Sequence, residues 1–329
     1  MVTINDIAKK AGVAKSTVSR YLNKGSVSPQ TREKIDKIIK ETGYTPNAFA
    51  RSLKAQKTNM LGVIIPRLSS ASTNEVLEGI DATARELGYQ LIITNSDQNL
   101  ERELENIQTL VRQKVEGVIM LARQITKQHI DLINQTSIPF LFIGQKEDSI
   151  HSMIHQDYEA GKKIGEYAIK LGHRQFLYVG VPEYDQAVGV DRKKGVLDAL
   201  KNEENITVES IETSFSRTAA YKKALEFLPN TTASYIVCAT DNIAVAILKA
   251  ASELGYSVPK DFSLSGFGGY EATSYVTPTI TTVSYPYKKL GKESVKKIAL
   301  LINKEEVPML SELGNKLVVK ESTKEYKES

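Results

Sequence analysis

Five small polar or cationic side chains lie close together near the start of the chain: Lys15, Ser16, Thr17, Ser19 and Arg20. Groups of this kind can hydrogen-bond to base edges and to phosphate oxygens. A helical period over residues 15–22 places Val18, Tyr21 and Leu22 on the inner side and the five polar residues on the outer side. These residues therefore predict contact with DNA, provided that neighbouring elements keep the outer side of this helix exposed to solvent.

A preceding helix over residues 3–11 can provide that support. Thr3 can cap its N-terminus, Asp6 suits the helix dipole, and Gly12 provides a left-handed stop. Its apolar face is formed by Ile4, Ile7, Ala8 and Ala11. Two short helices joined by a Gly-containing turn form a helix-turn-helix, which lays its second helix in the DNA major groove. The alternative is a surface helical hairpin with incidental charge.

A third helix is predicted from Ser28, with Pro29 in its first turn, to a stop at Gly43. It is followed by the segment G-Y-T-P-N-A-F-A-R-S-L-K at residues 43–54. With the pattern T-I-x-D-I-A-x-x-A-G-V-x-x-S-T-V-S-R from Thr3, residues 3–54 closely resemble the DNA-binding headpiece of the lactose-repressor (LacI/GalR) family of bacterial transcription regulators. The resemblance extends over essentially the whole chain.

The resemblance implies a set of DNA contacts. In the family, the segment matching residues 46–54 folds on operator DNA and pairs with that of a second subunit, and its leucine enters the minor groove. By that resemblance Leu53 is the wedge, with Arg51 and Lys54 beside it. The expected DNA-binding residues are Thr3, Lys15, Ser16, Thr17, Ser19, Arg20, Tyr44, Asn47, Ala50, Arg51, Leu53 and Lys54.

Charge and composition fit this picture. Residues 1–58 contain 12 Lys and Arg against 4 Asp and Glu, and because the whole chain carries +4, the remainder carries −4. A basic segment on a mildly acidic body attracts phosphates locally. The chain has no apolar run of about 18 residues, no signal-peptide pattern and a single cysteine, Cys238, expected to be buried. These features predict a cytoplasmic protein.

From residue 60, strand-like runs alternate with helical ones, which predicts βαβ units and a parallel sheet. The expected strands are 61–65, 90–94, 117–121 and 139–143, and the expected helices 75–87, 101–112 and 127–134. The scheme repeats with strands at 176–179, 208–212, 235–239 and 262–266 and helices at 192–201, 219–227 and 242–254. The sequence A-x-E-L-G-Y occurs at both 84–89 and 251–256, which supports two similar halves.

The expected fold is an all-α helix-turn-helix headpiece plus an α/β core of two doubly wound parallel-sheet lobes of the periplasmic-binding-protein type. The resemblance implies three crossings between the lobes, so that each lobe is discontinuous. The expected domains are a headpiece at 1–45, a hinge helix and linker at 46–58, an N-terminal lobe at 59–157 and 287–311, and a C-terminal lobe at 158–286 and 312–329.

Cores of this type bind ligands beyond the carboxyl ends of their strands, and the resemblance implies a small effector there. The expected effector-binding residues are Ser70, Ser72, Thr73, Gln145, Arg192, Phe215, Asp241 and Gly268. Arg192 offers a fork of donors, Phe215 an aromatic face and Asp241 a carboxylate for sugar hydroxyls. Alternative roles remain open: a surface arginine at a helix start, core packing and helix capping, respectively.

The chain departs from the family at two positions where many members carry a carboxylate, with Gly144-Gln145 after one strand and G-F-G-G at 266–269 after another. These losses leave Arg192 less neutralised, so the effector is expected to be a sugar or a sugar phosphate.

The function predicted from the sequence is a homodimeric repressor of a carbohydrate-utilisation operon that binds palindromic operator DNA. Residues 23–27 and 47–54 resemble members that control sucrose operons. A global catabolite regulator with a phosphoprotein co-repressor, a two-lobed solute-binding protein and an enzyme on the same core are the alternatives. No cofactor, metal or catalytic residue is predicted, because there is no dinucleotide fingerprint or P-loop, and the four histidines lack metal-ligand spacing.

Overall fold

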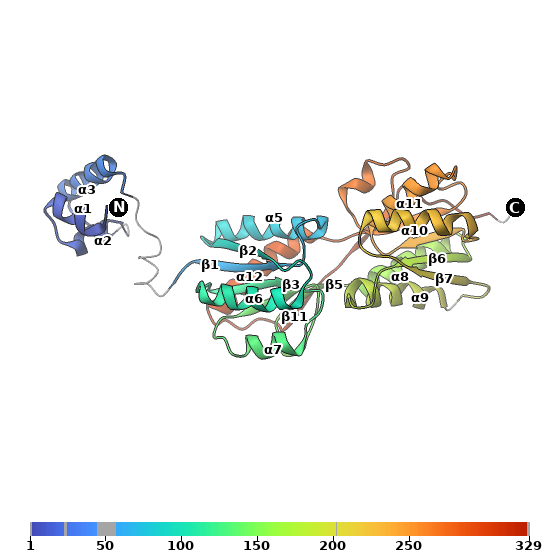
Figure 1. The fold of residues 1–329 in the computed structure, drawn as a ribbon, viewed down its shortest axis with the longest axis horizontal. Coiled ribbons are helices and arrows are strands. Elements are labelled where there is room, and N and C mark those ends of the chain that lie inside the picture. The colour runs from blue at the N-terminus through green and yellow to red at the C-terminus, as the bar shows by residue number, and fades with distance from the viewer. Residues whose placement is uncertain (1, 23–24, 45–56, 202, 328–329) are drawn as a thin grey trace. The chain divides into compact units, whose positions relative to one another are not determined.

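The computed structural model describes residues 2–22, 25–44, 57–201 and 203–327 (Figure 1). The chain divides into two compact units, Met1–Asn59 and Met60–Ser329. None of the helices in the described part of the chain is long and apolar enough to cross a membrane.

The first unit contains three helices, α1 (Ile4–Ala11), α2 (Lys15–Leu22) and α3 (Pro29–Thr42). Thr3 caps α1 and forms a reciprocal capping box with Asp6, and Gly12 ends the helix in the left-handed conformation with φ 66°. Ser28 caps α3, and Gly43 ends it with φ 60°. The predicted helix-turn-helix and third helix are therefore confirmed with their predicted starts and stops.

The second unit contains two six-stranded sheets. The first sheet has the order β11-β5-β4-β3-β1-β2, and every pair of neighbouring strands is parallel. Its strands are β1 (Met60–Ile65), β2 (Gln90–Asn95), β3 (Gly117–Leu121), β4 (Phe140–Ile143), β5 (Ser152–His155) and β11 (Leu310–Leu313). The helices around this sheet are α5 (Ala71–Glu86), α6 (Leu100–Arg112), α7 (Lys127–Ile133) and α12 (Tyr287–Ile302). We call this sheet with its helices the first lobe.

The alternation of side chains along the strands separates the two faces of this sheet. Val63 and Ile119 pack with Ile80 of α5 and Ile298 of α12 on one face. On the other face the strand residues pack with Ile107 of α6 and Ile130 of α7. Both faces are therefore covered, as expected of a doubly wound sheet.

The second sheet repeats this arrangement in the order β12-β10-β9-β8-β6-β7, with only the β10–β12 pair antiparallel. Its strands are β6 (Gln175–Gly180), β7 (Thr207–Glu212), β8 (Tyr235–Cys238), β9 (Ser263–Gly268), β10 (Thr281–Ser284) and β12 (Lys316–Val318). Its helices are α8 (Asp157–Lys170), α9 (Lys193–Lys201), α10 (Arg217–Phe227) and α11 (Asp241–Glu253), with short helical turns η1 (Gln186–Arg192), η2 (Leu228–Asn230) and η3 (Glu271–Ser274). Figure 1 shows α8 and α9 on one side of the strands and α10 and α11 on the other. We call this sheet with its helices the second lobe.

The chain passes between the two sheets after β5, after β10 and after β11. The helix α12 returns to the first lobe, where it packs on α5, β3 and β4. The expected lobe boundary between residues 311 and 312 falls inside β11, because that strand pairs with β5 from Leu310 to Leu313. The crossings lie side by side at the carboxyl ends of both sheets, where an effector site is expected.

Paired glycines allow two close helix contacts, one in each lobe. A Cβ at Gly79 of α5 would lie 2.1 Å from the carbonyl oxygen of Lys288 in α12, and a Cβ at Gly291 of α12 would lie 2.1 Å from that of Val76. In the second lobe a Cβ at Gly161 of α8 would lie 2.1 Å from the carbonyl oxygen of Arg192. These helices touch backbone to backbone, so that no larger residue fits at the contact.

One local prediction was wrong in detail. The helix expected over 192–201 does not begin at Arg192, because a π-helical turn, η1, precedes α9 without a break. Asp185 caps this turn by accepting a hydrogen bond from the Val188 N–H at 3.0 Å. Arg192 is therefore a residue inside a continuous helical segment and is buried, in contrast to the surface arginine at a helix start that was the alternative.

Candidate functional site

The helical unit is built on a small apolar core. Ile7, Ala8 and Ala11 of α1 pack against Val18 of α2 and Ile35 of α3, and all five are buried. Because the inner side of α2 is anchored in this way, its opposite side is turned to solvent.

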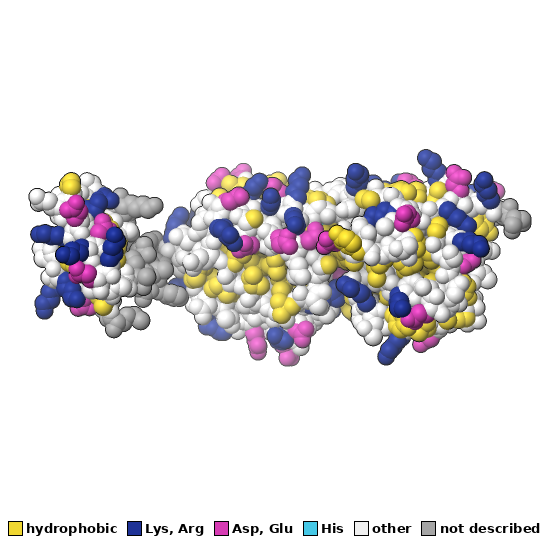
Figure 2. Space-filling model, turned by 90° about the horizontal axis from the view of Figure 1, so that it is seen from above, with side chains coloured by type: hydrophobic (Ala, Val, Ile, Leu, Met, Phe, Trp, Pro, Cys, Tyr) yellow, Lys and Arg dark blue, Asp and Glu magenta, His cyan; other side chains and the backbone are white. Residues whose placement is uncertain are grey.

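The outer side of α2 carries the residues expected to contact DNA. Lys15, Ser16 and Arg20 are exposed, and Thr17 and Ser19 are half-buried. Thr3 is exposed and is used as the cap of α1, and Tyr44 packs its ring on the edge of the core. On the face drawn in Figure 2, Lys and Arg side chains spread over this unit. The expected residues of the hinge, Asn47, Ala50, Arg51, Leu53 and Lys54, lie outside the described residues.

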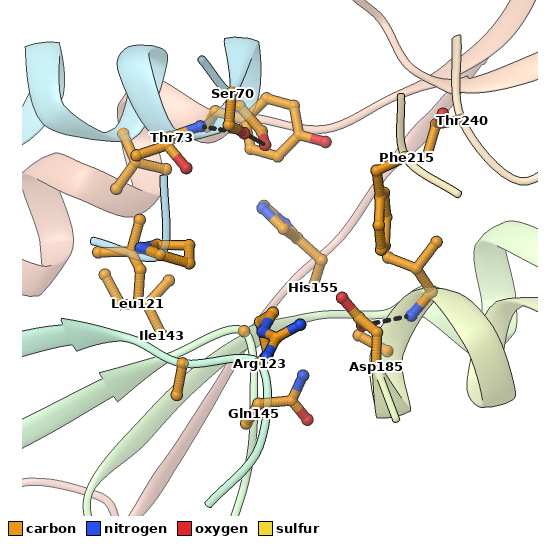
Figure 3. Close-up of a pocket in the computed structure, with 18 of the residues that line it drawn as sticks. Ser70, Thr73, Leu121, Arg123, Ile143, Gln145, His155, Asp185, Phe215 and Thr240 are labelled. Atoms are coloured by element: carbon orange, nitrogen blue, oxygen red, sulfur yellow. Dashed lines mark hydrogen bonds between the residues drawn. The ribbon is translucent and has the colours of Figure 1, made fainter. Parts of the chain in front are cut away.

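A pocket lies between the two lobes at the carboxyl ends of their strands (Figure 3). Six of the expected effector residues line it: Ser70, Ser72, Thr73, Gln145, Arg192 and Phe215. Ser70 caps α5 by accepting a hydrogen bond from the Thr73 N–H, which fixes both hydroxyls at the start of that helix. Figure 3 shows Ser70, Thr73, Leu121 and Gln145 on one side of the pocket and Phe215, Asp185 and Thr240 on the other. Both lobes therefore contribute side chains to one cavity.

Arg192 is held by groups of the protein itself. Its Nε and Nη2 donate to Asp157 Oδ1 at 3.0 and 2.5 Å, and its Nη1 donates to the carbonyl oxygen of Ala239 at 2.5 Å. Burial lowers the pKa of Arg192, but the neighbouring Tyr285 and Asp157 outweigh it and raise the pKa well above its usual value. The Tyr285 hydroxyl also donates to Asp157 Oδ1, at 2.8 Å. This charge is therefore compensated inside the site.

Asp241 and Gly268 do not belong to the residues that line this pocket. Asp241 is 1% exposed and accepts hydrogen bonds from the Thr282 hydroxyl at 2.6 Å and from the Tyr270 N–H at 2.8 Å. Burial raises the pKa of Asp241 to about 6, although these hydrogen bonds lower it. The cap of α11 is Thr240, which does line the pocket, and the expected capping by Asp241 is corrected accordingly.

Gly268 acts on the pocket through Tyr270. Its φ of 139° favours glycine, and a Cβ at this position would lie 2.7 Å from the Tyr270 ring. The Tyr270 ring lines the pocket, and its backbone is held by Asp241. At residue 268, where many family members carry a carboxylate, this chain therefore has a glycine whose backbone packs against the Tyr270 ring.

The sequence interpretation missed His155, at the end of β5. This side chain lines the pocket, and neither of its ring nitrogens has a hydrogen-bond partner among the described residues. Burial lowers the pKa of His155 to about 4, so the ring is neutral near pH 7. It packs against the rings of Tyr285 and Tyr287, with centroids 4.8 and 5.2 Å away. The sequence S-M-I-H at 152–155 offers no long apolar run, so β5 was not recognised.

Two further arginines, Arg67 and Arg123, lie at the pocket in addition to the expected Arg192. Arg67 follows β1, and its guanidinium carbon lies 4.8 Å from the centroid of the Phe215 ring. Arg123 follows β3, lies 4.8 Å from the centroid of the Tyr184 ring and donates to Gln98. Both arginines line the pocket from the first lobe and contact an aromatic ring of the second. Among the described residues, no group of three His, Cys, Asp or Glu is placed to hold a metal ion.

A helix-turn-helix with an exposed second helix in one unit and a pocket between two lobes in the other are typical of a ligand-responsive DNA-binding regulator. Residues 3–47 match the "Bacterial regulatory proteins, lacI family" domain, and residues 166–323 match the "Periplasmic binding protein-like domain". The chain is 41% identical to the sucrose operon repressor of Staphylococcus xylosus over 92% of this chain and 94% of that protein. It is 32% identical to catabolite control protein A of the same organism, over 93% and 94% of the two chains.

The fold closely matches that of a solved structure. The Lac repressor dimer bound to operator and the anti-inducer ONPF superposes with a TM-score of 0.90 at 26% identity, over 98% of this chain and 99% of that one. The chain therefore belongs to the LacI family and is a DNA-binding repressor of the LacI type.

Proposed function

We propose that this protein represses a carbohydrate-utilisation operon and is controlled by a small sugar or sugar phosphate bound between its lobes. The observation that carries the proposal is the pocket, to which both lobes contribute hydroxyl, amide and aromatic side chains. Hydroxyls and amides suit sugar hydroxyl groups, and an aromatic ring suits the apolar face of a sugar. The 41% identity to the sucrose operon repressor of Staphylococcus xylosus favours a sucrose operon.

Operator recognition is assigned to α2. Lys15, Ser16 and Arg20 are exposed on it and are proposed to contact base edges, while other Lys and Arg side chains of the unit neutralise phosphates. One headpiece reads one half-site, so a palindromic operator requires a homodimer. The hinge residues from Asn47 to Lys54 complete the contact by the family resemblance. Such a regulator acts where the bacterial chromosome lies, in the cytoplasm.

Control requires that the effector binds two states of the core with different affinity. Because Arg67 and Arg123 already touch aromatic rings across the cleft, a ligand between the lobes changes contacts on both sides at once.

A second candidate is a global catabolite regulator with a phosphoprotein co-repressor. It is favoured by the 32% identity to catabolite control protein A over nearly the whole chain. The higher identity to the operon-specific repressor makes it the alternative.

The deciding experiment is fluorescence-polarisation binding to a palindromic operator from upstream of the protein's own gene, across a salt series. Sucrose, fructose and their phosphates are added singly. We expect tight binding with a steep salt dependence and release by one of these compounds. Binding that a phosphorylated carrier protein strengthens would favour the global regulator, and a failure to bind operator DNA would overturn both.

A further inference from the structure

A second hollow adjoins the pocket on its outer side. It is lined in part by Arg67, Gln98, Phe215 and Asn242, which also line the pocket, and in addition by Arg217. We call the pocket the inner chamber and this hollow the outer chamber. A ligand longer than one sugar ring can therefore occupy both.

The outer chamber is cationic. Arg67 and Arg217 make no ion pair among the residues that the structure describes, and the carboxylate that lines the hollow, Asp97, is already paired with Arg102 at 3.6 Å. Arg67 is positioned by the Phe215 ring, and Arg217 by a hydrogen bond from its Nε to Asn242 Oδ1 at 2.9 Å. Both guanidinium groups thus keep N–H donors and an uncompensated charge at fixed positions.

The inner chamber differs in charge. The cation of Arg192 is compensated by Asp157, and Arg123 donates to the side-chain and main-chain oxygens of Gln98. The carboxylate of Asp185 also lines it, capping η1. His155 and Gln145 offer neutral hydrogen-bonding groups, and the ring nitrogens of His155 have no partner among the described residues. A buried polar group without a partner costs free energy, and a ligand hydroxyl would satisfy it.

We propose that the effector is a phosphate ester of a sugar, with its sugar against His155 in the inner chamber and its phosphate between Arg67 and Arg217 in the outer chamber. The two arginines come from different lobes, Arg67 after β1 and Arg217 at the start of α10. A planar guanidinium donates two parallel hydrogen bonds to phosphate oxygens. A phosphate held from both sides therefore fastens the lobes to one another. This inference rests on the proposed sugar control of the pocket.

The test is isothermal titration calorimetry on the full chain with matched pairs: sucrose and sucrose 6-phosphate, fructose and fructose 6-phosphate, fructose and fructose 1-phosphate. We expect one ester to bind at least about tenfold more tightly than its parent sugar, since a hydrogen bond to a charged group contributes about 1.5–3 kcal/mol and each 1.4 kcal/mol is a factor of about ten. Arg67→Gln and Arg217→Gln should each reduce this ratio about tenfold. Arg85→Gln, an exposed arginine on α5 paired with Asp81, is the matched control and should leave the ratio unchanged.

A second variant distinguishes the contribution of the inner chamber to ligand affinity from that of the outer chamber. His155→Ala should weaken the parent sugar and the ester by the same factor, so that the ratio stays constant. Circular dichroism of each variant checks that it is folded.

Equal affinity for ester and parent, or a ratio that the two arginine variants leave unchanged, overturns the inference. If a parent sugar alone binds and releases operator DNA, the proposed function stands and only the phosphate assignment fails. If no sugar or ester binds, both fail.

Discussion

Asp157 is the residue on which the buried charges of the pocket depend. Its Oδ1 accepts two hydrogen bonds from Arg192 and one from the Tyr285 hydroxyl, and its side chain is 9% exposed. Because Asp157 opens α8 just after the first crossing and Tyr285 follows β10 at the second, this carboxylate joins both crossings.

Asp157→Asn should destabilise the core, because it leaves the Arg192 cation buried without a counter-ion. Breaking a buried pair in this way costs about 3–5 kcal/mol. Urea denaturation followed by circular dichroism measures the loss of stability. Asp131→Asn removes a carboxylate from an exposed pair with Lys127 and should cost less than about 1 kcal/mol. Equal losses for the two variants would contradict the assignment.

Asp241 should impose a pH dependence on stability. Burial raises its pKa to about 6 in the folded protein, while an aspartate in an unfolded chain titrates near 3.9. The folded state therefore holds a proton that the unfolded state has lost between about pH 4 and 6. This contribution to the free energy of unfolding is present below pH 4. It is lost as the pH rises through 6, and the total loss is about 3 kcal/mol.

Asp241→Asn removes this dependence. Relative to the parent protein, the variant should gain about 3 kcal/mol of stability on going from pH 4 to pH 7, measured by urea denaturation at each pH. His155 has the opposite slope, because its pKa falls to about 4 on folding, but it is present in both proteins and cancels in the comparison. Parallel pH profiles would refute the raised pKa.

Among the elements, helices defined by local chemistry were the most predictable. α1 and α3 begin at capping hydroxyls and end at left-handed glycines, all of which are visible in the sequence. The central strands β1 and β3 were also predicted, because continuous apolar runs are typical of strands buried on both faces. β5, β10 and β11 mix polar with apolar residues, as S-M-I-H, T-T-V-S and L-S-E-L, and become strands through their partners, so that no apolar run marks them.

The same distinction explains the candidate site. Arg192 and Ser70 were located by the resemblance of their loops, and both line the pocket. Arg67 was missed because its role depends on an aromatic ring 148 residues further along the chain, at Phe215. Asp241 was expected in the pocket, but its side chain points inward to Thr282 and the Tyr270 backbone. This orientation depends on residues brought together by the folded lobe and cannot be seen in the sequence.

The contact between α5 and α12 should tolerate no side chain at its glycines. Gly79→Ala places a Cβ 2.1 Å from a backbone oxygen that cannot rotate away, and we expect a loss of about 3 kcal/mol or more. Asn74→Ala, at an exposed position of the same helix, is the control. Thermal unfolding followed by circular dichroism measures both, and an unchanged midpoint for the Gly79 variant would show that the helices can separate at no cost.

The helix α2 should determine the operator sequence that is recognised. Arg20→Ala is expected to lower operator affinity and to relax base preference at one position of each half-site, by about 1–3 kcal/mol. Lys37→Ala, on the exposed face of α3 and paired with Glu41, should leave base preference unchanged. Binding to a set of single-base operator variants measures this, and a uniform loss over all variants would assign Arg20 to a phosphate.

At the scale of the whole molecule, the helix proposed to read DNA and the pocket proposed to bind the effector lie in separate compact units. A fragment from Met60 to Ser329 should therefore keep the effector affinity of the full chain and lose operator binding. Calorimetry and fluorescence polarisation measure the two properties. A fragment with native circular dichroism but no effector affinity would show that the first unit takes part in the effector site.

The order in which the lobes can be completed follows from the three crossings. The edge strand of the first sheet, β11, and the last strand of the second, β12, both come from residues 310–318. A ribosome that has synthesised 300 residues has therefore made most of both lobes and finished neither. The nascent chain has to carry two open sheet edges until residues 310–318 emerge, so the preceding stage of synthesis is the one at which it depends most on protection from aggregation.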